Sequence, residues 1–193
     1  YGESITMEMH PEIRSEEACY ASSSNAVALA KKTGARLHVF HLSTAKETEL
    51  FKKHRDVTAK KITSEVCIHH LWFSDQDYAL LGSKIKWNPA VKKASDRDAI
   101  MQGVLDNKID VIATDHAPHT IEEKNNTYFS APSGGPLVQH ALVAMFEKFD
   151  QGVISKERIV EKMCHNPAEL FKVEQRGYLR EGYFADLVII DKN

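Results

Sequence analysis

The spacing of hydrophobic and polar positions changes along the chain in a way that predicts helices and strands in turn. A helix is expected to begin after Ser15, where an N-cap hydroxyl is followed by two acidic residues in the first turn. Its small and apolar positions run to Lys31-Lys32, and Gly34 follows as a residue suited to end a helix. The short apolar run at residues 35–40 then predicts a strand.

Two further apolar runs predict a second and a third strand. The second covers residues 61–68 and ends at His69-His70, and the third covers residues 109–114 and ends at Asp115. Helices are expected after Thr44, which forms a capping box with Glu47, after Ser95, over residues 137–149 and 156–164, and from Asn166. Strands that alternate with helices predict parallel βα units and hence an α/β fold.

The end of the chain has a different character. Residues 177–191 read Gly-Tyr-Leu-Arg-Glu-Gly and then Ala-Asp-Leu-Val-Ile-Ile-Asp. This pattern predicts a two-strand element after the last helix. It is expected to be separate from the parallel sheet.

Composition excludes several classes of protein. The 193 residues carry 25 basic and 27 acidic side chains, so the formal charge of -2 argues against a nucleic-acid or anionic-membrane binder. The sequence has no apolar run of about 18 residues and no visible secretory signal, so we expect no membrane partner. Three distant cysteines suit a reducing cytoplasm. The chain begins at Tyr1 rather than Met, which suggests processing or a longer parent protein.

The residues that follow the three strands are candidates for chemistry. The carboxyl ends of parallel strands form the active face of such folds, and imidazole and carboxylate groups there are typical ligands of catalytic zinc. His41, one of His69 and His70, and Asp115 are such groups, and Asp115 is also a candidate proton acceptor. A lone strand-end histidine is more often structural, so spacing alone leaves a metal site and a structural role both open. Asn88 and His119 lie in the following loops, where they could hydrogen-bond a polar substrate.

Several motifs resemble the cyclic amidohydrolases, and among them class I dihydroorotases most. The most specific is Thr-Asp-His-Ala-Pro-His at residues 114–119, together with His-Leu-Ser-Thr at 41–44 and Asn-Pro-Ala at 166–168. Further matching segments lie at residues 10–15, 65–71, 86–89 and 181–187. The resemblance covers nearly the whole chain in order.

The resemblance implies a (β/α)8 barrel with two zinc ions that reversibly cyclises N-carbamoyl-L-aspartate to L-dihydroorotate in pyrimidine synthesis. It implies that His41 binds metal and that Asp115 both binds metal and acts as the general acid/base. It places His69 and His70 near the site but not among the metal ligands. It implies substrate contacts from Asn88, His119, Ser133 and Gly134.

The chain lacks other residues that the family requires. The His-x-His pair, the arginine after it, a bridging carboxylate or modified lysine and one further histidine have no match, and His10 cannot replace them. The resemblance therefore implies the C-terminal part of a (β/α)8 TIM barrel in residues 1–172. Residues 173–193 would begin a C-terminal β-sandwich segment and supply one edge of this small domain. Because the zinc site is incomplete, the chain alone is expected to be inactive.

Two alternatives remain. The chain could belong to another cyclic amidohydrolase, such as an allantoinase or a hydantoinase, or to a non-catalytic dihydroorotase-like scaffold protein. The partner expected for the first reading is a small molecule, dihydroorotate or N-carbamoyl-L-aspartate, with no nucleic acid. The sequence leaves a homodimer open.

Overall fold

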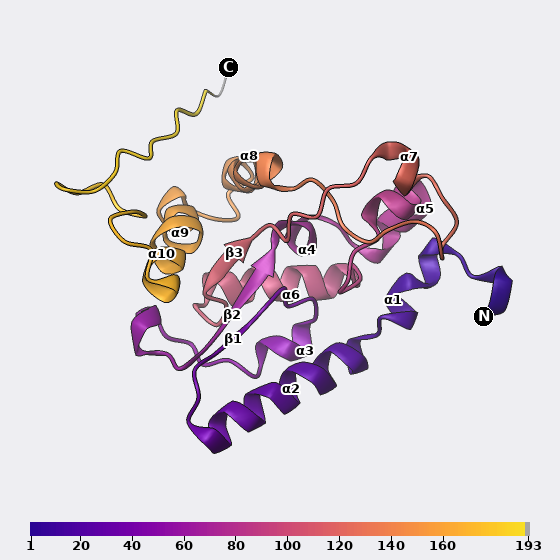
Figure 1. Ribbon diagram of the computed structural model, residues 1–193, viewed down its shortest axis with the longest axis horizontal. Helices are drawn as coiled ribbons and strands as arrows, with labels where there is room; N and C mark the ends of the chain where they lie inside the picture. Colours follow the sequence, from indigo (N-terminus) through magenta and orange to yellow (C-terminus); the bar gives the residue numbers. More distant parts are fainter. Residues whose placement is uncertain (192–193) are drawn as a thin grey trace.

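The computed structural model describes residues 1–191, except for the side chain of Glu3. A central sheet of three strands is surrounded by helices (Figure 1). The strands are β1 (Leu37–Val39), β2 (Ile62–Cys67) and β3 (Val111–Ala113). The helices are α1 (His10–Ile13), α2 (Glu16–Thr33), α3 (Ala45–Thr48), α4 (Ile68–Trp72), α5 (Tyr78–Leu81), α6 (Ala94–Leu105), α7 (Ile121–Lys124), α8 (Val138–Asp150), α9 (Lys156–Val160) and α10 (Asn166–Phe171).

The sheet confirms the predicted parallel arrangement. Its order is β1-β2-β3, with Leu37 paired to Ile62 and Glu65 paired to Val111. Each strand is reached through at least one helix, as parallel strands require. The carboxyl ends of all three strands therefore lie at one edge of the sheet.

One strand boundary differs from the prediction. β2 ends at Cys67, and His69-His70 belong to the helical turn α4 rather than to an extended segment. Alternation along a strand would bury only one of the two rings. The helical turn buries both: the His69 ring stacks on Trp87 at 4.5 Å, and Nε2 of His70 donates to the carbonyl of Pro89 at 3.1 Å.

The main hydrophobic core lies between one face of the sheet and the helices. Val66 and Ile112 of the sheet are fully buried there, in contact with side chains from the longer helices (Val27, Ile100, Val104, Ala141, Met145 and Ile159). Leu37 and Val39 pack against the same cluster. Side chains alternate along β1, so His38 points to the opposite face, where it hydrogen-bonds Thr63 and Glu65.

Helix ends explain most of the predicted boundaries. The Ser15 hydroxyl accepts from the Ala18 amide at the start of α2, and Gly34 ends this helix with φ of 72°. Thr44 caps α3 by accepting from the Glu47 amide. The predicted cap at Ser95 is wrong, because α6 already begins at Ala94.

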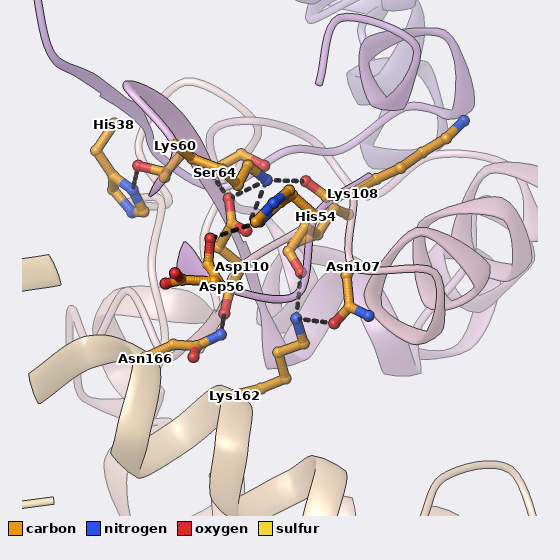
Figure 2. A network of polar contacts seen from close by, with 12 residues as sticks. His38, His54, Asp56, Lys60, Ser64, Asn107, Lys108, Asp110, Lys162 and Asn166 are labelled. Carbon is orange, nitrogen blue, oxygen red and sulfur yellow. Dashed lines mark hydrogen bonds and ion pairs between the residues drawn. The ribbon is translucent and has the colours of Figure 1, made fainter. Parts of the chain in front are cut away.

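A buried polar network ties the other end of β2 and β3 to the C-terminal helices (Figure 2). The Lys60 ammonium contacts both carboxylate oxygens of Asp110, at 2.6 and 2.8 Å, and Asp110 also accepts from the Ser64 amide. Lys162 donates to the carbonyl of Ile109, and Asn166 donates to that of Asp110. This network holds the ends of the strands that lie away from the predicted site.

The predicted two-strand element near the C-terminus is not formed. Residues 173–191 contain no strand. Tyr178 still stacks on His165 beside α10, and the last residues run away from the rest of the chain as the yellow trace in Figure 1. Leu187 and Val188 are largely exposed, and Ile189 is 96% exposed. A strand needs a neighbouring strand to bond its backbone groups, and no strand pairs with this segment within the described residues. Residues 192–193 of the predicted β-sandwich segment lie outside them.

No helix within residues 1–191 is both long and apolar enough to cross a membrane.

Candidate functional site

His41 and Asp115 occupy matching positions at the carboxyl ends of the two outer strands. Each is the second residue after its strand, β1 or β3. Both have a left-handed backbone, with φ of 40° for His41 and 48° for Asp115. Such a conformation costs about 1–3 kcal/mol for a residue with a side chain, and strain of this kind gathers at functional sites.

The His41 ring lies beside the buried histidines of α4. Its Nδ1 is buried and has no hydrogen-bond partner among the described residues. The same holds for both ring nitrogens of His69. Burial, with the nearby rings of His70 and His41, lowers the pKa of His69 well below its ordinary value, so His69 is neutral. His41 therefore presents a ring nitrogen that nothing in the described chain satisfies.

Asp115 is exposed and lies on the other side of the end of β2. Burial, followed by the nearby carboxylates of Glu65 and Asp115, raises the pKa of the Cys67 thiol, which keeps this last residue of β2 protonated. Within residues 1–191, no hydrogen bond or ion pair joins Asp115 to His41. The two side chains thus flank the end of β2 from β3 and β1.

The four predicted substrate-contacting residues meet around one loop. Asn88 Nδ2 donates to the Ser133 hydroxyl at 3.1 Å, and His119 Nε2 donates to the Ser133 carbonyl at 3.2 Å. The Gly134 amide donates to the carbonyl of Lys86 at 3.0 Å. Gly134 has φ of 130°, and a Cβ there would lie 2.5 Å from the carbonyl oxygen of Ala117. Only glycine fits this approach.

The same loop connects to Asp115 and its neighbours. Ala117 lies two residues after Asp115, and its amide donates to the carbonyl of Gly135 at 3.2 Å. On the other side, His41 and Asn88 line one open hollow, together with Arg14 and Glu47. The loop therefore contacts the segment that follows Asp115 through Ala117, and it contacts Asn88, which lines the hollow beside His41.

The described residues contain no complete metal site. Within residues 1–191, no group of three or more His, Cys, Asp or Glu side chains is placed to hold a metal ion. An unsatisfied imidazole nitrogen and an exposed carboxylate are nevertheless donors that zinc accepts. His41 and Asp115 thus fit two positions of a zinc site whose other ligands would lie outside the described residues.

Three buried residues beside this loop were not among the predicted site residues. His10 is 1% exposed; its Nε2 donates to the Trp87 carbonyl at 2.7 Å and its Nδ1 accepts from the Tyr128 hydroxyl at 2.8 Å. Burial lowers the pKa of His10 to about 4. Lys86 and Lys124 are also buried. The sequence does not indicate that Lys86 and Lys124 are buried, because their partners are backbone carbonyl groups of distant residues.

Comparison with known proteins identifies relatives for nearly the whole chain. A model of the amidohydrolase family matches residues 15–193. The dihydroorotase of Endomicrobium trichonymphae is 40% identical over 166 residues, and that of Carboxydothermus hydrogenoformans is 37% identical over 166 residues. Each match covers 86% of this chain but 39% and 38% of the respective relative. The chain thus spans about two fifths of the length of these curated relatives.

A solved structure supports the same relationship. An L-hydantoinase (dihydropyrimidinase) from Arthrobacter aurescens superposes with a TM-score of 0.78 and is 27% identical. The match covers 86% of this chain and 38% of that chain.

Proposed function

The chain belongs to the amidohydrolase family, and we propose that it is the C-terminal portion of a dihydroorotase. The complete enzyme would reversibly cyclise N-carbamoyl-L-aspartate to L-dihydroorotate. The three parallel strands would be the last three of a (β/α)8 barrel, closed by strands from the rest of the protein.

One observation carries this proposal: His41 and Asp115 are held in strained backbone conformations at matching positions after β1 and β3. A catalytic site on a barrel is built from residues at the carboxyl ends of several strands. The loop that joins Asn88, His119 and Ser133 lies at the same edge. The similarity to curated dihydroorotases favours this reaction over other ring openings.

We assign His41 and Asp115 as two protein ligands of a two-zinc centre. Bound zinc would polarise the amide carbonyl of the substrate and lower the pKa of the attacking water. Asp115 would accept a proton from that water during ring opening and deliver a proton to the ring nitrogen that leaves. In ring closure Asp115 would remove the same proton from nitrogen.

The loop residues would bind the substrate beside this centre. Asn88 and His119 would hydrogen-bond the polar atoms of the ring, together with the backbone at Ser133 and Gly134. Arg14 lines the hollow shared by His41 and Asn88, and its exposed guanidinium adds positive charge that favours an anionic substrate.

The chain would contribute to two domains of the complete protein. Residues 1–172 would belong to the barrel, and residues 173–193 would supply one edge of a small β-sandwich. The exposure of Leu187, Val188 and Ile189 supports this proposal, because an apolar extended segment gains stability when neighbouring strands cover it. Those strands would come from elsewhere in the protein.

A chimeric enzyme tests the proposed activity. The part of the E. trichonymphae dihydroorotase that precedes the matched region would be joined to this chain, and ring opening of dihydroorotate, hydantoin and allantoin would be measured with added zinc. We expect turnover of dihydroorotate, abolished by His41→Ala. A folded chimera that opens only hydantoin or allantoin would assign the chain to another cyclic amidohydrolase. A folded, zinc-loaded chimera that opens none would favour a non-catalytic scaffold.

A further inference from the structure

Lys86 and Lys124 are two buried cations without an anionic partner. Their exposed fractions are 8% and 5%, and no carboxylate within residues 1–191 pairs with either. Burying an ammonium group is costly unless its donors are satisfied. Here backbone carbonyl groups satisfy them.

Lys124 is bonded by all three of its donors. Its Nζ lies 3.2 Å from the carbonyl oxygen of Lys86, 3.0 Å from that of Pro132 and 2.9 Å from that of Gly134. An ammonium group has three N–H donors, so these three carbonyls saturate it. The acceptors come from two segments that are far apart in the sequence.

Lys86 joins the same two segments by hydrogen bonds in the opposite direction, from residue 86 to the loop that begins at Tyr128. Its Nζ donates to the carbonyls of Tyr128 and Ala131 at 2.5 and 2.6 Å, and it lies 4.6 Å from the centre of the Tyr128 ring. The Lys86 carbonyl accepts from both Lys124 Nζ and the Gly134 amide. The two lysines thus bind residues 128–134 to the segment that follows α5.

These contacts fix the distance between two predicted substrate contacts. Asn88 follows Lys86 by two residues, and Ser133 lies between the two carbonyls, of Pro132 and Gly134, that Lys124 holds. The Asn88 side chain donates to Ser133 at 3.1 Å across this junction. A shift of the Ser133 loop by one ångström would therefore break the arrangement that faces the substrate.

An uncharged side chain at position 124 would remove the donor to the carbonyls of Pro132 and Gly134 and would leave the Lys86 carbonyl with the Gly134 amide alone. Burial and the positive charge of Lys86 lower the pKa of Lys124 to about 8, so at neutral pH the ammonium form still predominates. The buried ammonium therefore holds two segments together through these carbonyls, which an apolar side chain could not do.

We propose that Lys124 is a positioning residue that sets the Ser133–Gly134 loop against Asn88 for substrate binding. The role in substrate binding rests on the proposed function, whereas the hydrogen bonds of Lys124 do not. The loop clasp itself, defined as Lys124 with the carbonyls of Lys86, Pro132 and Gly134, is tested independently of catalysis.

Amide hydrogen exchange on the 193-residue chain tests the clasp. In Lys124→Met, peptides covering residues 130–136 should exchange at least about tenfold faster, because three hydrogen bonds from a charged donor are lost. Lys84→Met is the matched control, since Lys84 is exposed and lies two residues from Lys86. It should leave exchange unchanged. Equal exchange in Lys124→Met and the unaltered chain would overturn the proposal.

Kinetics in the chimeric enzyme then separate positioning from general stability. In Lys124→Met the KM for dihydroorotate should rise about tenfold or more while kcat changes much less, as expected when ground-state and transition-state binding weaken together. A loss confined to kcat, or an equal rise of KM in Lys84→Met, would contradict the positioning role. If the unaltered chimera does not open dihydroorotate, the proposed function fails, and the exchange result still decides the clasp.

A labelling experiment needs no variant and covers the case in which Lys124→Met does not fold. Amine acetylation of the unaltered chain, followed by mass spectrometry, should modify Lys124 and Lys86 at least about tenfold more slowly than Lys84, because buried, fully bonded ammonium groups are protected. Equal rates at the three lysines would show that the clasp does not form.

Discussion

Removing the charge of Asp110 is the sharpest test of the polar network at the amino ends of the strands. The side chains of Lys60 and Asp110 are 5% and 1% exposed, and Lys60 Nζ contacts both carboxylate oxygens (Figure 2). In Asp110→Asn the Lys60 ammonium stays buried with neutral acceptors only, the Asn amide oxygen and the carbonyl of Lys108. Breaking a buried pair from one side costs about 3–5 kcal/mol, and we expect a loss of unfolding free energy in this range.

Two further variants separate charge from packing. Lys60→Met combined with Asp110→Asn removes both charges, and the amide oxygen of Asn can still accept from the Ser64 amide at the position of the 3.1 Å bond. This double variant should be more stable than Asp110→Asn alone. The exposed Lys53–Asp106 pair provides a control, and Asp106→Asn should leave the unfolding midpoint unchanged.

Urea unfolding followed by far-UV circular dichroism measures all three changes. The reasoning is refuted if Asp110→Asn unfolds at the same urea concentration as Asp106→Asn. It is also refuted if the double variant is no more stable than the single one, because the buried, unpaired ammonium would then carry no cost.

Three further predictions concern the site. Burial lowers the pKa of His10 from 6.5 to about 4. As pH falls, the histidine of the unfolded chain therefore takes up a proton at a higher pH than the histidine of the folded chain. Up to about 3 kcal/mol of unfolding free energy should be lost between pH 6.5 and 4. His10→Gln should flatten this part of a pH–stability curve, and an unchanged slope would exclude His10 as its source. Gly135→Ala should cost about 1–3 kcal/mol in urea unfolding, since its Cβ would lie 2.7 Å from the Trp87 ring; an unchanged midpoint would contradict the packing. Asp115→Asn should lower kcat of the metal-loaded chimera roughly 10²–10⁴-fold, and near-normal turnover would argue against a proton-transfer role.

Local sequence signals were sufficient for most of the fold. Ser15, Thr44 and Gly34 mark helix ends through contacts with residues a few positions away, so their roles can be read from the chain. The three apolar runs predicted parallel strands because they alternate with helices along the chain. The boundary at Cys67 could not be read, because the burial of His69 depends on a ring stack with the distant Trp87.

The C-terminal segment shows that a sequence pattern can predict a strand that the structure does not form. Its run of apolar residues at positions 187–190 predicts a strand, yet within residues 1–191 no neighbouring strand bonds it, and it stays exposed. The sequence pattern favours an extended backbone, but a strand forms only when another strand pairs with it. A strand assignment therefore needs a partner as well as a pattern.

Some residues of the candidate site could be predicted from sequence motifs, and others depend on tertiary contacts. Motifs singled out Asn88, His119 and Ser133, and the structure brings these three together around one loop. Their chemical roles remain predictions. Lys124 gave no signal, because its three acceptors are backbone carbonyls whose positions depend on the folded loop.

The central claim is that this chain supplies two ligands, His41 and Asp115, of a zinc site completed by the rest of the barrel. Zinc content per chain after dialysis, measured by atomic emission, tests it most directly. We predict about two zinc ions in the chimeric enzyme, fewer in His41→Ala and Asp115→Ala, and none held by the 193-residue chain alone, because a catalytic zinc needs about three protein ligands. Stoichiometric, tightly held zinc in the isolated chain, or an unchanged content in both variants, would contradict the account.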